Sequence, residues 1–278
     1  MDEWKEYAIA AKEAGKTYFT IGLELDELFG IKKSVDQLRT VCCPRIAAKT
    51  DKPRVVLVIA DTHFPFQHTN YLQFLKDTAK EYGATDVVHI GDMCDNHAIS
   101  RWQSETDADS ATAEFDKALA CVKQYTEAFP KATLLLGNHC KIPERQAATL
   151  GIPSGFLKST HELWQLPDSW VVTEQVIIDD VLYDHGINAL GVNGALNKAT
   201  TSMMSCVIGH SHSCGGVQYR SNDKHLIFGL NVGCGISIRS YAFRYGKYNK
   251  FRETLGCGIV YNSAHADFIP MGAKYFDS

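Results

Sequence analysis

Long apolar runs are missing from this sequence. No run reaches the length of about 20 residues that a membrane-spanning helix needs. The N-terminus, MDEWKEYAIA, is acidic and amphipathic, so it does not resemble a secretory signal peptide. We therefore expect a cytoplasmic protein that has no membrane partner.

The sequence also lacks the cysteine spacing of a disulfide framework. Its nine cysteines are an odd number, Cys42 and Cys43 are adjacent, and no C-x-x-C pair occurs. Together with the missing signal peptide, this favours reduced and mostly buried thiols. It argues against a structural zinc site built from four cysteines.

An excess of positive charge is absent as well. The chain has 28 Lys and Arg against 32 Asp and Glu, a net charge of −4 at pH 7. Any surface that binds nucleic acid electrostatically must therefore be local. What is present is an ordinary globular composition, 45% apolar and 22% charged over 278 residues, which is enough for a large domain with or without a small one.

Residues 1–50 are predicted to form a small helical unit. Three amphipathic stretches are each stopped by glycine or proline, and the last two are joined through FGIKK like a helix-turn-helix. Lys32, Lys33 and Arg39 would lie on or near the last helix. Because residues 1–52 hold nine basic and nine acidic residues, DNA binding and a plain helical cap on the main domain both stay open.

Residues 54–278 are predicted to form an α/β domain. Buried apolar strands alternate with amphipathic helices, which indicates βαβ units and a largely parallel sheet, followed by a β-rich part. The expected strands lie within 54–60, 86–90, 132–136, 170–186, 205–212, 225–234 and 256–271, and the first helices cover 70–83 and 110–129.

Polar residues follow five of these strands at the points where the strands end. They form the segments D-T-H, G-D-M-C-D, G-N-H, H-G and G-H-S-H. In open α/β sheets the carboxyl ends of the strands border the binding crevice, so we expect these segments to meet at one edge. The candidate metal ligands are Asp61, His63, Asp92, Asn138, His185, His210 and His212.

The ligand types favour divalent cations of intermediate hardness. Carboxylate, amide and imidazole groups without thiolate suit such ions. Seven ligands are too many for one ion and about right for two that share a carboxylate. Two cations roughly 3.5–4 Å apart clamp the attacking and leaving oxygens of an in-line displacement at phosphorus.

In this order, the five segments resemble the calcineurin-like metallophosphoesterase family over about residues 54–270, and DNHAISRW is similar to phosphoesterases of bacteria and their phages. The resemblance implies a four-layer α/β/β/α sandwich, with the helical unit as an extension, that hydrolyses phosphoric esters. A hydroxide bridging two cations would attack phosphorus. Mn²⁺ is the expected metal, with Fe, Zn or Ni as alternatives. The first ion would be held by Asp61, His63, Asp92 and His212, and the second by Asp92, Asn138, His185 and His210.

The same resemblance gives roles to two residues that hold no metal. His139 would sit by the leaving oxygen as general acid or phosphate contact, and Asp95 would orient its imidazole. Two positions depart from the family pattern. Cys140 stands where an acid is common, and we expect it to be a bystander behind the loop, with a thiolate ligand as the alternative. Asn96 replaces an arginine of the protein Ser/Thr phosphatases, which weakens the case for a phosphoprotein substrate.

Several residues are candidates for contact with a substrate. Arg145, His97 and Arg101 lie near the motifs, and arginine suits bidentate phosphate binding, although ordinary structural roles stay open. The segment RSYAFRYGKYNKFR, 239–252, has five basic residues, five aromatic residues and no acid. Such a segment favours a nucleic-acid or nucleotide partner, or a flap whose rings pack on the domain.

The first functional hypothesis is therefore a phosphodiesterase that acts on nucleic acid or nucleotides. One alternative is a phosphomonoesterase for small molecules or phosphoproteins. Another, of a different class, is a DNA-binding regulator with an inactive phosphoesterase scaffold, although the complete ligand set argues against it. His89, inside an expected strand, is predicted to be a hydrogen-bonded core residue and not a ligand.

Overall fold

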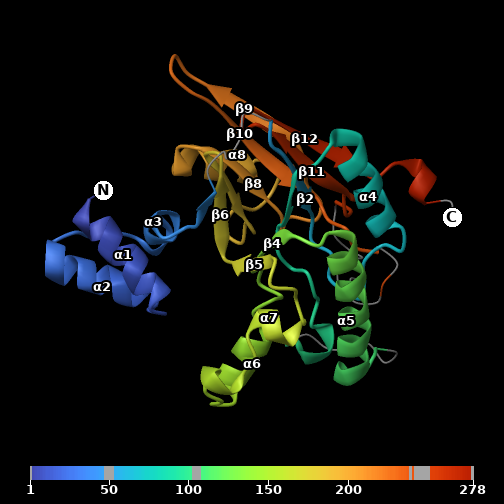
Figure 1. The fold of residues 1–278 in the computed structure, drawn as a ribbon, viewed down its shortest axis with the longest axis horizontal. Coiled ribbons are helices and arrows are strands. Elements are labelled where there is room, and N and C mark those ends of the chain that lie inside the picture. The colour runs from blue at the N-terminus through green and yellow to red at the C-terminus, as the bar shows by residue number, and fades with distance from the viewer. Residues whose placement is uncertain (1, 47–52, 102–107, 238–239, 241–250, 277–278) are drawn as a thin grey trace.

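The structure, a computed structural model, describes residues 2–46, 53–101, 108–237, 240 and 251–276. Two six-stranded sheets pack face to face, and helices cover their outer sides (Figure 1). The four-layer α/β/β/α sandwich implied by the family resemblance is confirmed. The segment 239–252 lies outside the described residues apart from Ser240, Phe251 and Arg252.

The first sheet contains the early βαβ units. Helices α4 (Tyr71–Tyr82) and α5 (Ala111–Ala128) connect its parallel strands and cover its outer face. Two strands from the end of the chain extend it in antiparallel pairing. Its order is β12 (His265–Pro270), β11 (Gly256–Tyr261), β2 (Val55–Ile59), β3 (Asp86–His89), β4 (Ala132–Leu135) and β5 (Trp170–Thr173).

The second sheet mixes parallel and antiparallel pairs. Helix α8 (Gly194–Ser202) packs on its outer face. A two-residue strand at its edge belongs to the segment that leads out of the N-terminal helices. Its order is β1 (Arg45–Ile46), β6 (Gln175–Ile178), β7 (Val181–Asp184), β8 (Ser205–Ile208), β10 (Leu226–Val232) and β9 (Gly215–Ser221).

Strand β2 shows why the sequence gives this layering. Val56 and Val58 belong to the core between the two sheets, whereas Leu57 and Ile59 belong to the core under the helices. Successive side chains of a strand point to opposite faces, so a strand buried on both sides is a continuous apolar run. Each large apolar side chain buried in this way stabilises the fold by about 1.5–3 kcal/mol.

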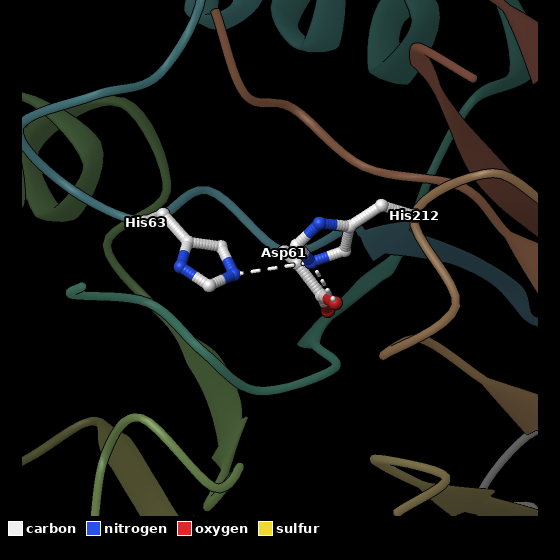
Figure 2. A group of neighbouring side chains, drawn as sticks. All are labelled: Asp61, His63 and His212. Atoms are coloured by element: carbon white, nitrogen blue, oxygen red, sulfur yellow. Dashed lines mark hydrogen bonds and ion pairs between the residues drawn. The ribbon is translucent and has the colours of Figure 1, made fainter. Parts of the chain in front are cut away.

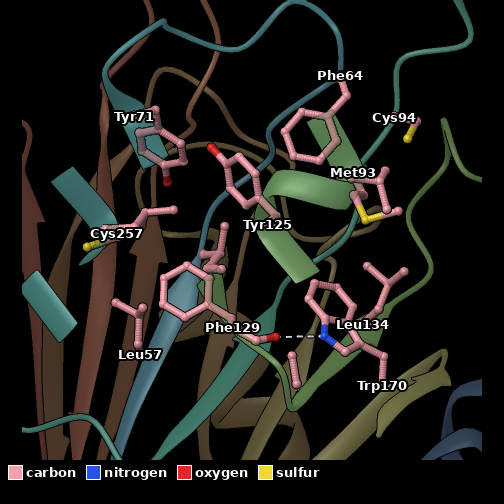
Figure 3. Packing of buried hydrophobic residues seen from close by; sticks show 14 of the residues in the cluster. Leu57, Phe64, Tyr71, Met93, Cys94, Tyr125, Phe129, Leu134, Trp170 and Cys257 are labelled. Atoms are coloured by element: carbon pink, nitrogen blue, oxygen red, sulfur yellow. Dashed lines mark hydrogen bonds between the residues drawn. The ribbon is translucent and has the colours of Figure 1, made fainter. Parts of the chain in front are cut away.

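Aromatic rings fill the core beneath the helices (Figure 3). Phe64 and Tyr125 meet edge to face with ring centroids 4.6 Å apart, a favourable geometry for aromatic pairs. Trp170 is buried, and its indole N–H donates to the carbonyl oxygen of Phe129 at 2.8 Å. The floor of the loops that follow β2, β3 and β4 is therefore firmly packed.

The N-terminal helices α1 (Glu3–Glu13), α2 (Tyr18–Phe29) and α3 (Val35–Val41) form a unit beside the second sheet (Figure 1). Helix α2 ends at Gly30, whose φ of 65° is readily adopted by glycine. Ser34 and Gln37 form a capping box that starts α3. The unit has a small core of its own, formed by Ala8, Ala11, Ile21, Leu25 and Leu38.

Shorter elements lie at the edges of the sandwich. Among the described residues, no helix combines the length and the apolar character needed to cross a membrane. The short elements are α6 (Ile142–Thr149), α7 (Thr160–Leu163) and the 3-10 turns η1 (His97–Ile99), η2 (Ser154–Phe156) and η4 (Ala273–Tyr275).

Candidate metal and catalytic site

Loops from both sheets bring the predicted ligands together. The first sheet supplies the loops after β2, β3 and β4, and the second supplies the loops after β7 and β8. The side chains fall into three groups whose ligand atoms lie within 4.8 Å of one another: Asp61, His63 and His212; Asp92, His185 and His210; and His63, Asp95 and His139.

The first group surrounds the buried carboxylate of Asp61 (Figure 2). His212 Nε2 lies 3.2 Å from Asp61 Oδ2 and 3.1 Å from His63 Nε2. The other oxygen, Asp61 Oδ1, is buried without a hydrogen-bond partner among the described residues. Burial alone would raise the pKa of this carboxyl, but His185 and His212 lower it below its ordinary value. The group therefore presents an anionic oxygen to two imidazole nitrogens.

The second group surrounds His185. Its Nδ1 lies 3.1 Å from the carbonyl oxygen of Ile90, to which it donates when it carries the ring proton, and this leaves Nε2 facing the site. That Nε2 is 3.1 Å from Asp92 Oδ2 and 3.1 Å from Asn138 Oδ1. His210 completes the group with Asp92 and His185. A carboxylate, an amide oxygen and two imidazoles thus converge.

Asp92 lies between the two groups. Its Oδ2 is 3.1 Å from His185 Nε2 and 3.9 Å from His63 Nε2, while its Oδ1 accepts the backbone N–H of His139 at 2.7 Å. Burial would raise the pKa of this carboxyl, but His185, His139 and His63 hold it well below its ordinary value. Oδ2 of Asp92, which belongs to the second group, thus also lies near His63 of the first group.

The third group is a hydrogen-bonded arrangement around Asp95. Its Oδ1 lies 2.5 Å from His63 Nδ1 and 3.1 Å from His139 Nδ1, and its backbone carbonyl oxygen is 2.8 Å from His139 Nδ1. Burial would lower the pKa of His139, but Asp95 and Asp92 raise it to about 9. The sequence assigned Asp95 only to His139, whereas the structure also places it against His63.

Three of the candidate ligands have an uncommon backbone conformation. His63, Asp92 and His210 have φ angles of 48°, 46° and 64°, which are uncommon for residues other than glycine. Such conformations cluster at functional sites, where the surrounding structure holds them in place. Close packing adds to the constraint, because a Cβ at Gly137 would collide with the Asp92 carboxylate and one at Gly209 with that of Asp61. Alanine is therefore excluded at both glycines.

The donor set fits two divalent cations. It comprises two carboxylates, one amide oxygen and four imidazoles, and the unpartnered Asp61 Oδ1 and the facing nitrogens of His63 and His212 offer lone pairs to a cation. Cys140 belongs to none of the groups found among the described residues. Burial raises the pKa of its thiol to about 12, so it stays protonated at neutral pH.

The candidate substrate contacts have different surroundings. Arg145 is exposed, and its Nη2 donates to the carbonyl oxygen of Asn138 at 2.9 Å, which places its guanidinium beside a ligand loop. His97 is only 9% exposed, and its Nδ1 lies 3.9 Å from Asp95 Oδ2, so it is a mostly buried neighbour of Asp95. Arg101 is exposed at the end of a described range.

Two buried polar residues support the loops without belonging to any motif. His89 Nε2 lies 3.0 Å from Thr62 Oγ1, which donates to the carbonyl oxygen of Met93 at 2.9 Å. His89 is thus a buried, hydrogen-bonded core residue, as predicted. Glu114 is only 4% exposed and occupies the buried face of α5 with Ala118 and Val122. A glutamate at a position where the helix pattern expects an apolar residue is a signal in the sequence that could have identified Glu114 as a buried polar residue.

Comparison with known proteins gives a family. The sequence model of the family described as calcineurin-like phosphoesterase matches residues 54–214, more than half of the chain. No curated protein matches. Similar solved structures include Vacuolar Protein Sorting 29 from Cryptosporidium parvum, which is 14% identical in sequence and has a TM-score of 0.41. The alignment covers 76% of this chain and 86% of that chain. Another is YfcE, a phosphoesterase from E. coli, with 13% identity, 74% and 87% covered, and a TM-score of 0.39.

The family match covers the segments that carry all seven candidate ligands. Those ligands gather at the ends of strands from two packed sheets, in groups suited to divalent cations. The chain belongs to the calcineurin-like phosphoesterase family and is a metal-dependent hydrolase of phosphoric esters.

Proposed function

We propose that this protein is a phosphodiesterase that acts on nucleotides or nucleic acid with two Mn²⁺ ions. Asp61, His63 and His212 would hold one ion and Asn138, His185 and His210 the other, with Asp92 shared between them. When bound, the two cations supply Lewis acidity to the phosphoryl oxygens and acidify water. The remaining chemistry falls to the side chains around them.

His139 is proposed as the proton donor to the leaving oxygen. Its side chain is 25% exposed, so it borders both the buried carboxylates and the substrate side. Its Nδ1 is engaged by Asp95, so Nε2 would be the nitrogen that donates to the leaving oxygen, and its raised pKa keeps the ring protonated at neutral pH. A positioned acid of this kind contributes about 10²–10⁴-fold to the rate.

The positively charged side chains beside the Asn138–His139 loop support a phosphodiester as the substrate. Lys141 is paired with Glu174 at 2.9 Å, whereas Arg145 is exposed and anchored to Asn138. The guanidinium of Arg145 carries one positive charge, which matches the single negative charge of a phosphodiester. Arginine also suits bidentate phosphate contact. Nucleotides and nucleic acid are the proposed diesters because the segment 239–252 combines basic and aromatic residues.

A metal-supplemented activity screen tests the proposal. The purified protein is stripped with chelator, reloaded with Mn²⁺, Fe²⁺, Zn²⁺ or Ni²⁺, and offered bis-p-nitrophenyl phosphate, p-nitrophenyl phosphate, and single- and double-stranded nucleic acid. We expect the highest diester activity with Mn²⁺. Cleavage of the monoester alone would show that the diester assignment is wrong and that the protein is a phosphomonoesterase.

The nucleic-acid part has a separate test. Neutralising Lys247, Lys250 and Arg252 together should flatten the salt dependence of nucleic-acid binding, because each phosphate contact releases counterions. Hydrolysis of the small diester by the same variant serves as the control and should be unchanged. A salt slope equal to that of the wild type would remove this segment from the binding surface.

A further inference from the structure

Glu114 makes an unusual contact with the catalytic loops. It lies on α5, is almost fully buried, and accepts the backbone N–H groups of His97 and Ala98 at 2.7 and 2.8 Å, one on each carboxylate oxygen. The two N–H groups belong to η1, the turn that follows Asp95. A carboxylate with both oxygens on backbone N–H groups makes charge-assisted bonds, which are stronger than neutral ones. Glu114 therefore fixes the turn from a distant helix.

The turn that Glu114 holds is connected to His139. Asn96 Nδ2 donates to the carbonyl oxygen of His139 at 3.0 Å, and Asn96 itself has a φ of 57°. Asp95, one residue earlier, contacts the imidazoles of His139 and His63. A shift of the turn would thus move both the backbone and the ring of His139.

Packing alone does not hold this turn. A cavity of about 240 Å³ adjoins it, and Asn96, Ala98, Glu114, Phe115 and Trp164 are among the residues that line it. Side chains next to a cavity lack contact atoms on that side, so they are held less firmly than in a filled core. The position of the turn depends on its hydrogen bonds, and Glu114 provides two of them.

We propose that Glu114 is a positioning residue for the hydrolytic reaction, which fixes the Asp95–Ala98 turn and through it the orientation of His139. The inference rests on the proposed role of His139 as proton donor. The hydrogen bonds that Glu114 accepts come from the backbone N–H groups of His97 and Ala98, and neither residue is a proposed metal ligand. Its loss should therefore lower proton donation, while His63, whose backbone N–H also donates to the carbonyl oxygen of Asp92 at 3.0 Å, keeps its place in the first group.

The test compares leaving groups in the Glu114→Gln variant. A glutamine keeps the size but turns an NH₂ group toward one of the two backbone N–H donors, which opens the turn. A poor leaving group depends more on a proton donor than a good one does. We expect kcat to fall about tenfold for methyl phenyl phosphate and only about twofold for methyl p-nitrophenyl phosphate, with KM and metal content unchanged.

Three further variants distinguish a positioning role of Glu114 from a general loss of folding or activity. Glu127→Gln changes an exposed glutamate of the same helix and should leave both rates unchanged. Asn96→Gly removes the amide that binds His139, while glycine tolerates the positive φ, and should reproduce the loss that depends on the leaving group. His139→Ala gives the full loss of proton donation for comparison.

Each outcome decides the matter. Equal losses for both esters, or loss of metal in Glu114→Gln, would overturn the positioning role, and so would rates equal to those of Glu127→Gln. If Glu114→Gln does not fold, Asn96→Gly decides by the same comparison. A wild type that cleaves only monoesters contradicts the proposed diester function, and phenyl and p-nitrophenyl phosphate then replace the diesters. A wild type that cleaves no ester overturns the proposed function and the inference together.

Discussion

The ligand loops and the N-terminal helices were both predicted from sequence patterns. The pattern of the loops predicts a function, whereas the pattern of the helices predicts only a structure. The loops combine residue identity, spacing and position at strand ends, and within each group the ligand atoms of their side chains lie within 4.8 Å of one another. The helices show only an amphipathic period, and they form a unit with a small core. An amphipathic pattern predicts burial, whereas chemically specific residues at strand ends predict a reaction.

The basic residues of the helical unit show the same difference. Arg39, on the helix that would enter a DNA groove, lies 3.9 Å from Glu174, and Lys32 lies 3.7 Å from Asp26. Charges shared with acids of the same chain contribute less to phosphate binding than unpaired ones. DNA binding by this unit stays a prediction, and the plain cap stays open beside it.

The largest effect should follow from Asp92→Asn. The change removes the carboxylate that we propose both cations share, and loss of several kcal/mol of electrostatic stabilisation lowers the rate by about a thousandfold or more. Metal content, measured by elemental analysis after dialysis, should fall at both sites. Asp223→Asn, an exposed position, is the matched control. Full activity in Asp92→Asn would disprove the shared ligand.

Leu25→Ala should separate the two regions. Leu25 is fully buried in the core of the N-terminal unit. The cavity left when a buried leucine becomes alanine destabilises a fold by about 2–5 kcal/mol. Protease cleavage within residues 2–46 should accelerate, while hydrolysis of the small diester stays unchanged. Leu28→Ala on the same helix, where Leu28 is 59% exposed, should be nearly neutral. Parallel loss of activity would show that the catalytic domain depends on the helices.

The buried His89 should make stability depend on pH. Burial lowers its pKa to about 3, so between about pH 6.5 and 3 the unfolded chain binds a proton that the folded chain does not. Stability therefore falls as the pH is lowered through this range. The free energy of unfolding is measured with urea at pH 7.5 and at pH 5. Between these two pH values it should fall by about 2 kcal/mol less in His89→Gln than in the wild type. The exposed His225→Gln is the control, and an equal loss in both variants contradicts the prediction.

The smallest effect should come from Cys140→Ser. The thiol is protonated and lies outside the metal groups found in the described part of the chain, so metal content should not change. Activity should stay within about twofold, the range of a change near 0.5 kcal/mol. Loss of metal in this variant would restore the thiolate ligand that the sequence left open.

Much of the site could be predicted because its ligands are local to strand ends. Asp61 follows an apolar run directly, and Asn138 and His210 each follow one after a single glycine, so strand position places each of them at the end of a strand. Glu114 could not be assigned a partner in this way, because it reaches η1 across the fold from a helix. The double contact of Asp95 also depends on the exact approach of two loops, which spacing does not encode. The fold was predictable in its α/β order, whereas its second sheet came from the family resemblance.

The first and second groups of candidate ligands each take side chains from loops of both sheets. Asp61 and His63 belong to the first sheet and His212 to the second, and the other group divides its ligands in the same way. A cation held by such a group is a cross-link between the two halves of the sandwich. By mass action, a cation at a hundred times its dissociation constant adds about 2.7 kcal/mol to folding stability if it does not bind the unfolded chain. Metal supply would then control how long the folded protein persists, in addition to how fast it works.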